Sequence, residues 1–522
     1  MVARHHTVGV EIGLTVEGVW QCVVVRFEAW VAGVQDLPSK SKAVLTLGIV
    51  CRQLTMLEFE PDDTRYLQEL AEFVAIPSIS RDGNHDAMHS AAQWLVDQLP
   101  FAGAHLVETS GHPVVVGEWT GIEGSPTILI YGHYDVQPIG DRDEWLSDPF
   151  VMTRDGNNVR GRGVTDDKGP VYIVLKVTQA FFAQEGSLPL NVKFLFEGEE
   201  EIGSPHLASF IADHAQALAA DLVISADGAM WRADEPSLSI GSKGLVSMDI
   251  EVTGAHDDLH SGRYGGVVPN PIHALGEIIA GLHNRDGGVA VPGFYDGIAP
   301  LTPQRRQEIA AVPFSEECFL KGLGLPVGFG EAGYSLLERL WERPTLEING
   351  VRAGGKYTVI PHLATANVSC RLVPGQDPNA VLDAIRAHIG GLALPGVEIR
   401  LNVDEARIPA YSISANHTAI QAARTALNLV YPGQEVLLAK IAGTLPPVTL
   451  FEEYLGAKTL FFSFSTADER LHAPNEYLRI HRLREGMRAW EQLWRILAAG
   501  GRSLNPDRSD DPMKSSGCDD VR

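Results

Sequence analysis

The chain has 522 residues, of which 45% are hydrophobic, and a formal net charge of −24. A single hydrophobic core does not grow to this size, so we expect more than one compact domain. The strong negative charge argues against nucleic acid or an anionic membrane face as a partner. The five cysteines have no paired short spacing, which predicts neither a disulfide framework nor a thiolate zinc site and favours a reducing cytoplasm.

The first 55 residues differ from the rest of the chain. Glu11, Glu17, Arg26 and Glu28 interrupt their Val-rich pieces well before the roughly 18 apolar residues that a membrane-spanning helix needs. Glu11 also breaks the apolar region of a signal peptide, and no small-residue cleavage site follows it. We therefore interpret residues 1–55 as an N-terminal extension without a catalytic role.

The apolar run over residues 126–130 predicts a buried strand, and it leads into Tyr131-Gly132-His133-Tyr134-Asp135. Residues two apart on a strand point the same way, so His133 and Asp135 share a face. His133 could bind a metal through one ring nitrogen while Asp135 accepts the opposite N–H. Taken alone, such a His-x-Asp sequence is more often a hydrogen-bonded polar pair.

Acidic residues downstream repeat this placement, each just past a short apolar strand or at a glycine turn. They are Asp166 and Asp167 in the turn 161–169, Glu199, Glu200 and Glu201 after the run 192–196, and Asp227 after the run 221–226. In open α/β sheets, sites form at the carboxyl ends of strands, which predicts one crevice that also holds His133. So many carboxylates would repel one another unless cations neutralised them. One divalent metal ion, and more readily two, is the economical explanation.

The alternation of strands and helices around these segments predicts a mostly parallel sheet with helices on both faces. Helices are expected over 86–99 and 170–184. Ser204 followed by Pro205 predicts a further helix, with the serine as its N-cap.

The pattern changes after residue 238, where long strands predict an inserted α+β domain. The expected strands cover 244–253, 365–373 and 397–403, and the expected helices cover 271–283 and 379–389. A strand over 459–464 and a helix over 478–499 then complete the first domain, and a polar, disordered tail follows. The predicted division is an extension (1–55), a catalytic domain in two parts (56–240 and 411–500), an inserted domain (241–410) and a tail (501–522).

Six short segments, in this order, resemble the motif set of the co-catalytic zinc peptidases. They are His133-Tyr134-Asp135, Asp166–Gly169, Glu200–Ser204, Asp227, His260-Ser261-Gly262 and Leu471–Glu476. That family includes carnosinases, cytosolic nonspecific dipeptidases, succinyl-diaminopimelate desuccinylase and glutamate carboxypeptidase. The similarity extends from about Met56 to about residue 498 and is strongest to the dipeptidase and carnosinase branch.

Single segments also have ordinary structural explanations. Glu199–Glu201 could be the acidic entrance of a helix, Asp227-Gly228 could be a turn, and His472 could be one of eighteen histidines on a surface loop. None of these explains why all the segments fall in the family's order.

The resemblance implies five metal ligands. Asp166 would bridge two ions, with His133 and Asp227 on one ion and Glu201 and His472 on the other. This set of nitrogen and oxygen donors suits Zn²⁺, and Mn²⁺ or Co²⁺ would also be acceptable.

The resemblance also implies the catalytic residues. Glu200 would be the general base that takes a proton from water and delivers it to the leaving amine, with Asp135 supporting His133. His260 matches a histidine of the lid and dimerisation domain that, in related dimers, reaches the partner's active site and stabilises the oxyanion.

Two further residues resemble substrate-binding positions. Arg371 matches an arginine that clamps a substrate carboxylate, although a surface ion pair is its ordinary alternative. Thr444 lies in the segment 441–446, where relatives carry a Gly-Gly-Ser-Ile-Pro loop at the substrate end. Ala442, Thr444 and Leu445 depart from that loop and leave the exact substrate open.

The sequence therefore predicts a dinuclear-metal hydrolase of dipeptides or short peptides with a free C-terminal carboxylate. It would be a cytoplasmic homodimer, with no nucleic-acid or membrane partner. The alternative within the same chemistry is an N-acyl or N-carbamoyl amino acid amidohydrolase. The alternative from another class is a non-catalytic binding protein on the same fold, against which the intact Glu200 and the five occupied ligand positions count.

Overall fold

The computed structural model describes residues 56–59, 62–355, 357–501 and 504, together with the backbone of four short strands before residue 54. The chain divides into two compact units, Met1–Phe59 and Glu60–Arg522. The predicted extension lies outside the described residues apart from its four strands. The predicted tail lies outside them apart from residues 501 and 504.

The four strands of the first unit pair antiparallel in one sheet. They are β1 (Val10–Glu17), β2 (Trp20–Ala29), β3 (Ala43–Leu45) and β4 (Arg52–Gln53). The order is β1-β2-β3, and β4 also pairs with β2.

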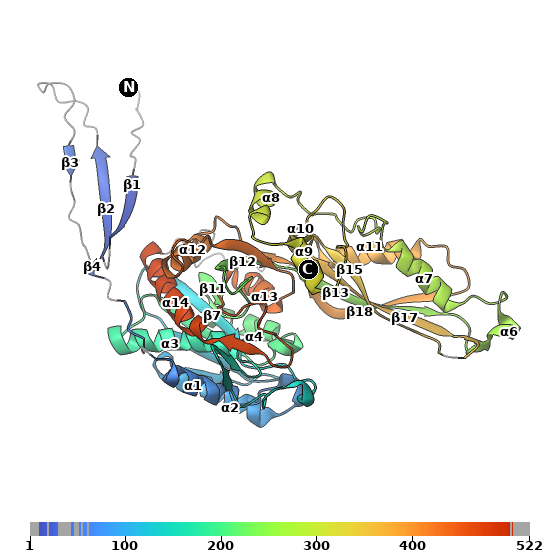
Figure 1. The fold of residues 1–522 in the computed structure, drawn as a ribbon, viewed down its shortest axis with the longest axis horizontal. Coiled ribbons are helices and arrows are strands. Elements are labelled where there is room, and N and C mark those ends of the chain that lie inside the picture. Colours follow the sequence, from blue (N-terminus) through green and yellow to red (C-terminus); the bar gives the residue numbers. More distant parts are fainter. Residues whose placement is uncertain are drawn as a thin grey trace, which may run out of the picture. The chain divides into compact units, whose positions relative to one another are not determined.

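The second unit is built around a six-stranded sheet in the order β21-β11-β7-β10-β6-β5. Figure 1 labels two of its central strands, β7 and β11. These strands are β5 (His105–Val107), β6 (Val114–Trp119), β7 (Thr127–His133), β10 (Asn191–Glu197), β11 (Leu222–Ser225) and β21 (Thr459–Phe461). The four strands from β21 to β10 run parallel, and β6 and β5 continue antiparallel at one edge. The mostly parallel sheet that the sequence predicts is confirmed.

Helices cover both faces of this sheet, which is why its central strands are continuous apolar runs. Leu129 and Tyr131 of β7 pack in one cluster with Phe210 of α4 (Leu207–Asp213) and Phe451 of α13 (Pro446–Leu455). The opposite face is covered by α3 (Lys168–Glu185), against which α14 (Ile480–Gly500) packs. The remaining helices of this layer are α1 (Thr64–Val74), α2 (His85–Gln98) and α12 (Thr418–Val430).

The close approach of α3 to β7 depends on Gly132. A Cβ atom there would lie 2.5 Å from Val171 Cγ2 and 2.8 Å from Asp167 Oδ2. A side chain of any size would therefore push the first turn of α3 away from the strand. The glycine keeps the loop before α3 against the carboxyl end of β7.

A second sheet of four antiparallel strands has the order β15-β17-β13-β18. Its strands are β13 (Gly244–Thr253), β15 (Thr345–Ala353), β17 (Leu363–Leu372) and β18 (Glu398–Ile408). Alternate residues of β13 are buried against α7 (Pro271–Gly281) and α11 (Pro378–Gly390), which cover one face. This is the α+β insertion that the sequence predicts.

Smaller elements connect these sheets. The strands are β8 (Thr153–Asp155), β9 (Asn158–Arg160), β12 (Ser237–Ser242), β14 (Leu259–His260), β16 (Val359–Ile360), β19 (Tyr411–Ser412), β20 (Leu437–Ile441) and β22 (Tyr477–Arg479). The helices are α5 (Ala215–Leu218), α6 (Ser261–Tyr264), α8 (Pro303–Ala310), α9 (Glu316–Gly322) and α10 (Leu336–Glu342). Four 3₁₀ turns cover Ser80–Asp82, Pro100–Ala102, Arg142–Glu144 and Glu200–Ile202.

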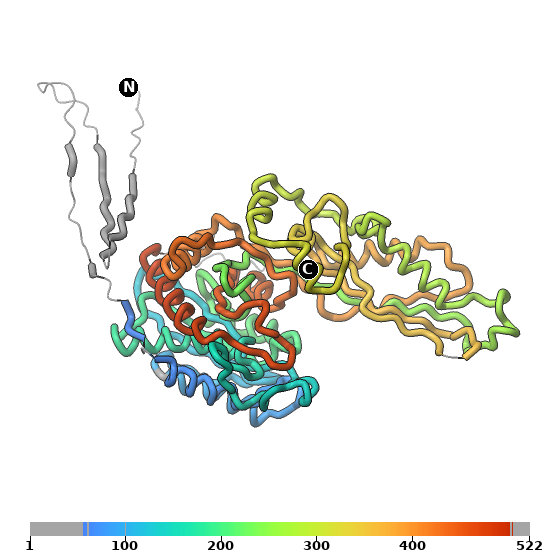
Figure 2. Tube along the Cα trace, in the orientation of Figure 1, coloured from blue at the N-terminus to red at the C-terminus, as the bar shows by residue number. Residues whose placement is uncertain are grey.

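The C-terminal part of the chain returns to the first sheet after the insertion. In Figure 2 its orange and red segments lie among the blue and cyan segments from the first part of the chain. β21 pairs with β11, and α14 packs on α3. No helix among the described residues has the length and apolar character that crossing a membrane would require.

Two local predictions are wrong. Ser204 does not cap a helix, because α4 begins at Leu207 with His206 as its N-cap. Ser204 instead has a positive φ of 51° and donates its hydroxyl to Glu197 Oε1 at 2.9 Å. The strand expected over 459–464 ends at Phe461.

Candidate metal centre

Five side chains from distant parts of the sequence form two overlapping groups of metal-ligand type. His133, Asp166 and Asp227 form one group, and Asp166, Glu201 and His472 form the other. Within each group, the ligand atoms lie within 4.8 Å of one another. The structure thus brings together all five residues that the sequence singles out as ligands.

The parallel strands explain most of this convergence. His133 ends β7, Glu201 follows β10 and Asp227 follows β11, so three neighbouring strands deliver ligands at their carboxyl ends. Asp166 arrives differently, on the loop between β9 and α3. His472 lies on the loop between β21 and β22.

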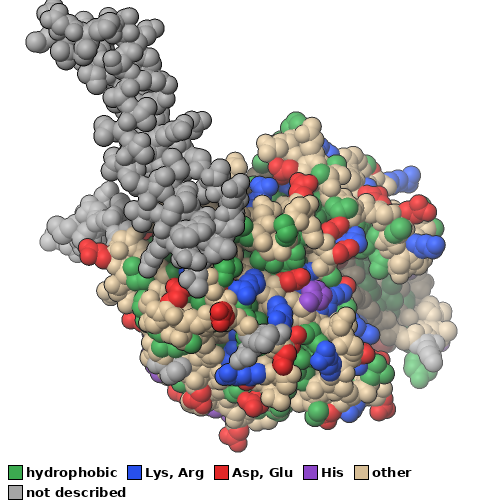
Figure 3. All heavy atoms as spheres, turned by 60° about the vertical axis from the view of Figure 1, so that its left-hand side comes forward, with side chains coloured by type: hydrophobic (Ala, Val, Ile, Leu, Met, Phe, Trp, Pro, Cys, Tyr) green, Lys and Arg blue, Asp and Glu red, His purple; other side chains and the backbone are tan. Residues whose placement is uncertain are grey.

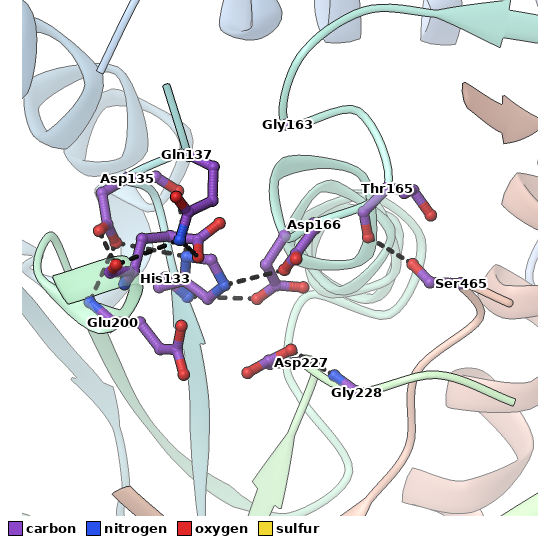
Figure 4. A network of polar contacts seen from close by, with 12 residues as sticks. His133, Asp135, Gln137, Gly163, Thr165, Asp166, Glu200, Asp227, Gly228 and Ser465 are labelled. Carbon is purple, nitrogen blue, oxygen red and sulfur yellow. Dashed lines mark hydrogen bonds and ion pairs between the residues drawn. The ribbon is translucent and has the colours of Figure 1, made fainter. Parts of the chain in front are cut away.

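The two oxygens of Asp166 face different histidines (Figure 4 shows Asp166 beside His133). Asp166 Oδ1 lies 3.2 Å from His133 Nε2, and Asp166 Oδ2 lies 2.9 Å from His472 Nε2. His472 Nε2 is also 3.2 Å from Glu201 Oε2. Asp166 is therefore the one member of both groups, with one oxygen directed to each.

Asp135 organises the residues around it. Its backbone oxygen lies 3.1 Å from His133 Nδ1, and its side chain lies 3.3 Å from the same nitrogen. This contact occupies Nδ1 and leaves Nε2 turned toward Asp166. The carboxylate of Asp135 also accepts the backbone N–H groups of Glu200 and Glu201, at 3.2 and 3.0 Å.

Glu200 belongs to neither ligand group, although it is next to Glu201 in the chain. Its side chain points into the space beside His133 and Asp227 (Figure 4). Burial raises the pKa of Glu200 well above its usual range, and the neighbouring carboxylates of Asp227 and Glu201 add to this.

The charges of the cluster test whether metal ions fit it. Burial raises the pKa of Asp227 to about 6. Burial also works against the ionised form of Asp166, but hydrogen bonds with His133 and His472 hold its pKa well below its usual range. Hydrogen bonds with Asp166 and Glu201 raise the pKa of His472 to about 10. The buried carboxylates thus draw protons onto themselves or onto the histidines, and divalent cations would supply the same positive charge.

The chemistry of the donors agrees with this test. Two imidazole nitrogens and three carboxylates are ligands that zinc takes in proteins, and Mn²⁺ and Co²⁺ accept similar sets. The residues present therefore fit one or more divalent ions.

The predicted substrate residues Arg371 and Thr444 are also brought together. Arg371, half-buried on β17, donates from Nη1 to Thr444 Oγ1 at 2.7 Å. Thr444 lies on the loop between β20 and α13, and Lys243 N donates to Gly443 O of that loop at 2.9 Å. Arg371 forms no ion pair within the described part of the chain, so the alternative of a surface ion pair is not realised there.

His260 is a predicted catalytic residue that the single chain does not bring into the cluster. It is exposed on β14, and its Nδ1 accepts a hydrogen bond from Gly262 N at 3.1 Å. No hydrogen bond or ion pair among the described residues connects it to the five ligands.

Two residues that hold ligands have no predicted role from the sequence. Gln137 donates from Nε2 to Glu201 Oε2 at 2.8 Å, and the buried Glu476 accepts the backbone N–H of Asp166 at 3.2 Å. Gln137 carries no signal in the sequence beyond lying four residues after His133. Glu476 stands in the same motif as His472, and that position was its only signal.

Comparisons with known proteins agree with the site. The model of peptidase family M20/M25/M40 matches residues 129–496. The Cys-Gly metallodipeptidase DUG1 of Candida albicans is 30% identical, over 82% of this chain and 92% of the relative. The Beta-Ala-His dipeptidase of Homo sapiens is 29% identical, over 70% of this chain and 73% of the relative.

Solved structures give the same result. The M20 family metallo-carboxypeptidase Sso-CP2 from Sulfolobus solfataricus has a TM-score of 0.73 and 31% identity, and the match covers 83% of this chain and 99% of that one. Human carnosine dipeptidase 1 has a TM-score of 0.69 and 27% identity, with 83% and 96% covered. The predicted fold, the branch of the family and a metal-dependent hydrolase of peptide bonds are confirmed. The chain belongs to peptidase family M20/M25/M40.

Proposed function

We propose that this peptidase hydrolyses dipeptides and other short peptides with a free C-terminal carboxylate, and that it uses two divalent metal ions. The observation that carries the proposal is the shared position of Asp166, whose two oxygens face His133 and His472 separately. The relatives named for Cys-Gly and Beta-Ala-His dipeptides support the substrate class.

His133 and Asp227 would hold one ion, and Glu201 and His472 the other, with Asp166 between them. Zn²⁺ is the proposed metal, because the donors are imidazole nitrogens and carboxylate oxygens. Bound there, the ions would polarise the scissile carbonyl and make a water molecule more acidic.

Glu200 would move the proton. Its carboxylate would accept a proton from the attacking water and pass it to the leaving amine. Asp135 holds the backbone N–H groups of Glu200 and Glu201, so one side chain fixes the positions of base and ligand together. Asp135 is for this reason part of the proposed catalytic group.

Arg371 would bind the substrate's C-terminal carboxylate. Its guanidinium is half-buried and oriented by the Thr444 hydroxyl, which supports a role in binding an anion with fixed geometry. His260 would act from the other subunit of a homodimer, where it would stabilise the oxyanion. The segment 241–410 would then be the lid and dimerisation domain.

The cellular setting is also part of the proposal. We propose a cytoplasmic enzyme that acts on small peptides and has no nucleic-acid or membrane partner. On the face drawn in Figure 3, acidic and basic side chains are interspersed, so neither sign of charge is concentrated into one patch there. This surface supports the absence of a polyanionic partner.

A substrate panel on metal-reconstituted protein tests the function. Chelation should abolish hydrolysis, and Zn²⁺, Mn²⁺ or Co²⁺ should restore it with up to two ions per chain. Dipeptides should be cleaved, and amidation of their C-terminus should lower kcat/KM about 10–100-fold, since charged hydrogen bonds contribute roughly 1.5–3 kcal/mol.

The same panel distinguishes the alternatives. Cleavage of N-acyl or N-carbamoyl amino acids in place of dipeptides would identify an amidohydrolase. Binding without turnover would favour the non-catalytic alternative. Full activity after verified removal of all metal would contradict the proposed mechanism.

A further inference from the structure

Glu476 lies fully buried between the loop of His472 and the loop of Asp166. Its carboxylate accepts four hydrogen bonds, from Arg162 Nη1 (2.7 Å), Gly163 N (2.9 Å), Thr165 N (3.0 Å) and Asp166 N (3.2 Å). All four donors belong to the loop that carries the shared ligand. One carboxylate oxygen takes the first two bonds and the other oxygen takes the last two.

The backbone of the His472 loop has an unusual conformation. Arg470, His472 and Asn475 have φ values of 61°, 59° and 63°, a region that side-chain-bearing residues rarely adopt. Such a loop persists only when surrounding contacts determine its shape. It is held at both ends: Glu469 accepts the Thr165 hydroxyl at 2.6 Å, and Glu476 makes the bonds described above.

A buried ion pair that only stabilises the fold is the ordinary explanation for Glu476. Arg162 supplies one of the four hydrogen bonds, however, and the other three come from backbone N–H groups that converge on the carboxylate. Converging N–H groups form an anion-binding concavity, which fixes the path of the backbone that makes it. The last of these N–H groups is that of Asp166 itself. This hydrogen bond therefore fixes the backbone position from which the side chain of the shared ligand extends.

We infer that Glu476 is a positioning residue for the metal centre, which sets the placement of Asp166 relative to His472 and thereby the affinity for metal. It belongs to neither ligand group. The inference rests on the proposed metal dependence and adds a residue that acts through the ligands.

The test compares two variants that each replace one buried carboxylate. Glu476→Gln keeps the shape, but in either orientation its amide nitrogen, itself a donor, faces two of the four donors. Glu491→Gln is the matched control: Glu491 is also fully buried, and it bonds Arg488 and Arg495 on its own helix, α14. These partners lie outside the loops of Asp166 and His472. Full-length protein is used, and the affinity for Zn²⁺ and for Co²⁺ is measured by chelator competition beside the thermal midpoint.

Glu476→Gln should bind Zn²⁺ and Co²⁺ about 10–100-fold more weakly, the usual effect of changing a residue that orients metal ligands. Its activity should rise toward that of the wild type as the Zn²⁺ concentration is increased. Glu491→Gln should lower the thermal midpoint and leave the metal affinity unchanged. Equal affinity in Glu476→Gln and wild type, or equal losses in both variants, would overturn the inference.

A second variant decides the matter if Glu476→Gln does not fold. Glu476→Asp keeps the charge and shortens the reach by one methylene, so it should weaken metal binding at a near-normal thermal midpoint. Wild-type affinity in that variant would overturn the inference. If the wild-type protein itself took up no metal, the proposed function would be contradicted. That result differs from wild-type affinity in a Glu476 variant, which contradicts only the role of Glu476.

Discussion

The adjacent glutamates Glu200 and Glu201 have the same side chain, and they differ only in where the 3₁₀ turn Glu200–Ile202 places that side chain. Glu201 lies in a ligand group with Asp166 and His472, while Glu200 belongs to no group and points into the space beside Asp227. Both backbone N–H groups are fixed by Asp135. Chemically identical side chains thus take different positions relative to the ligand groups.

Glu200→Gln should lower the turnover rate by about 10²–10⁴ while leaving metal content nearly unchanged, because it removes a proton acceptor and no ligand. Glu201→Gln should lower metal content as well as rate. Metal analysis of both purified proteins, beside kcat on a dipeptide, checks the pair. Loss of metal from Glu200→Gln with full occupancy in Glu201→Gln would mean that the two roles are reversed.

The ligands could be predicted from the sequence because each of the five lies in a short segment with its own signal. His133, Glu201 and Asp227 follow apolar runs that are recognisable as parallel strands. The contact of Glu476 with Asp166 spans 310 residues, and no spacing in the sequence encodes such a contact. The prediction that Ser204 caps a helix is wrong because Ser-Pro is typical of a helix start, whereas here the hydroxyl donates to the buried Glu197.

At the scale of elements, the contact between β7 and α3 places the start of the helix beside the metal centre. Gly132 permits the contact, and Asp167 at the helix N-cap accepts the backbone N–H of His133 at 3.2 Å. The strand that ends in a ligand and the helix that follows Asp166 are therefore held together at one point.

Gly132→Ala should destabilise the protein by about 1–3 kcal/mol, the usual cost of inserting an atom into a filled interior. Gly276→Ala is the matched control, because a Cβ at that exposed position of α7 meets no atom within 4 Å. Alanine there should stabilise the helix by roughly 0.5–1 kcal/mol. Denaturant unfolding of both variants measures the difference. A Gly132→Ala protein as stable as the wild type would show that β7 and α3 separate without cost.

Most elements could be predicted from the sequence, but not all of their ends. The strand expected over 244–253 and the helix expected over 379–389 differ from β13 and α11 by at most one residue at either end. The strand expected over 459–464 is longer than β21 because Phe462 and Phe464 stay buried after β21 has ended. Burial determines the apolar pattern, but hydrogen bonds to a neighbouring strand determine where a strand ends.

At the scale of the whole molecule, one chain supplies the five ligands and Glu200 but leaves His260 apart from them. His260 is exposed on β14, and its ring Nδ1 accepts a hydrogen bond from Gly262 N. The proposed homodimer accounts for this separation, since a second subunit would deliver the same residue in trans.

His260→Ala chains mixed with Glu200→Gln chains should therefore regain activity after subunit exchange. In the mixed dimer, one site combines an intact Glu200 with an intact His260 and the other site carries both defects. That dimer should approach about half of the wild-type rate, whereas each parent should be nearly inactive.

His273→Ala, which changes an exposed histidine of α7, is the control and should be active without mixing. The measurement is the rate of dipeptide hydrolysis as a function of the ratio in which the two variant chains are mixed. A fully active monomer, or no recovery despite proven exchange, would contradict the trans role.

The late position of β21 and His472 in the chain also affects how the enzyme is made. β11 gains its outer neighbour, β21, only after the whole inserted sheet has been synthesised. At about 5–20 residues per second, the ribosome takes on the order of tens of seconds to cover that interval. During this time the nascent chain carries an open strand edge beside a group of unneutralised acids, and it is then most exposed to aggregation. The ligand group of Asp166, Glu201 and His472 is complete only when His472 has emerged, so the candidate metal centre is finished as one of the last events of synthesis.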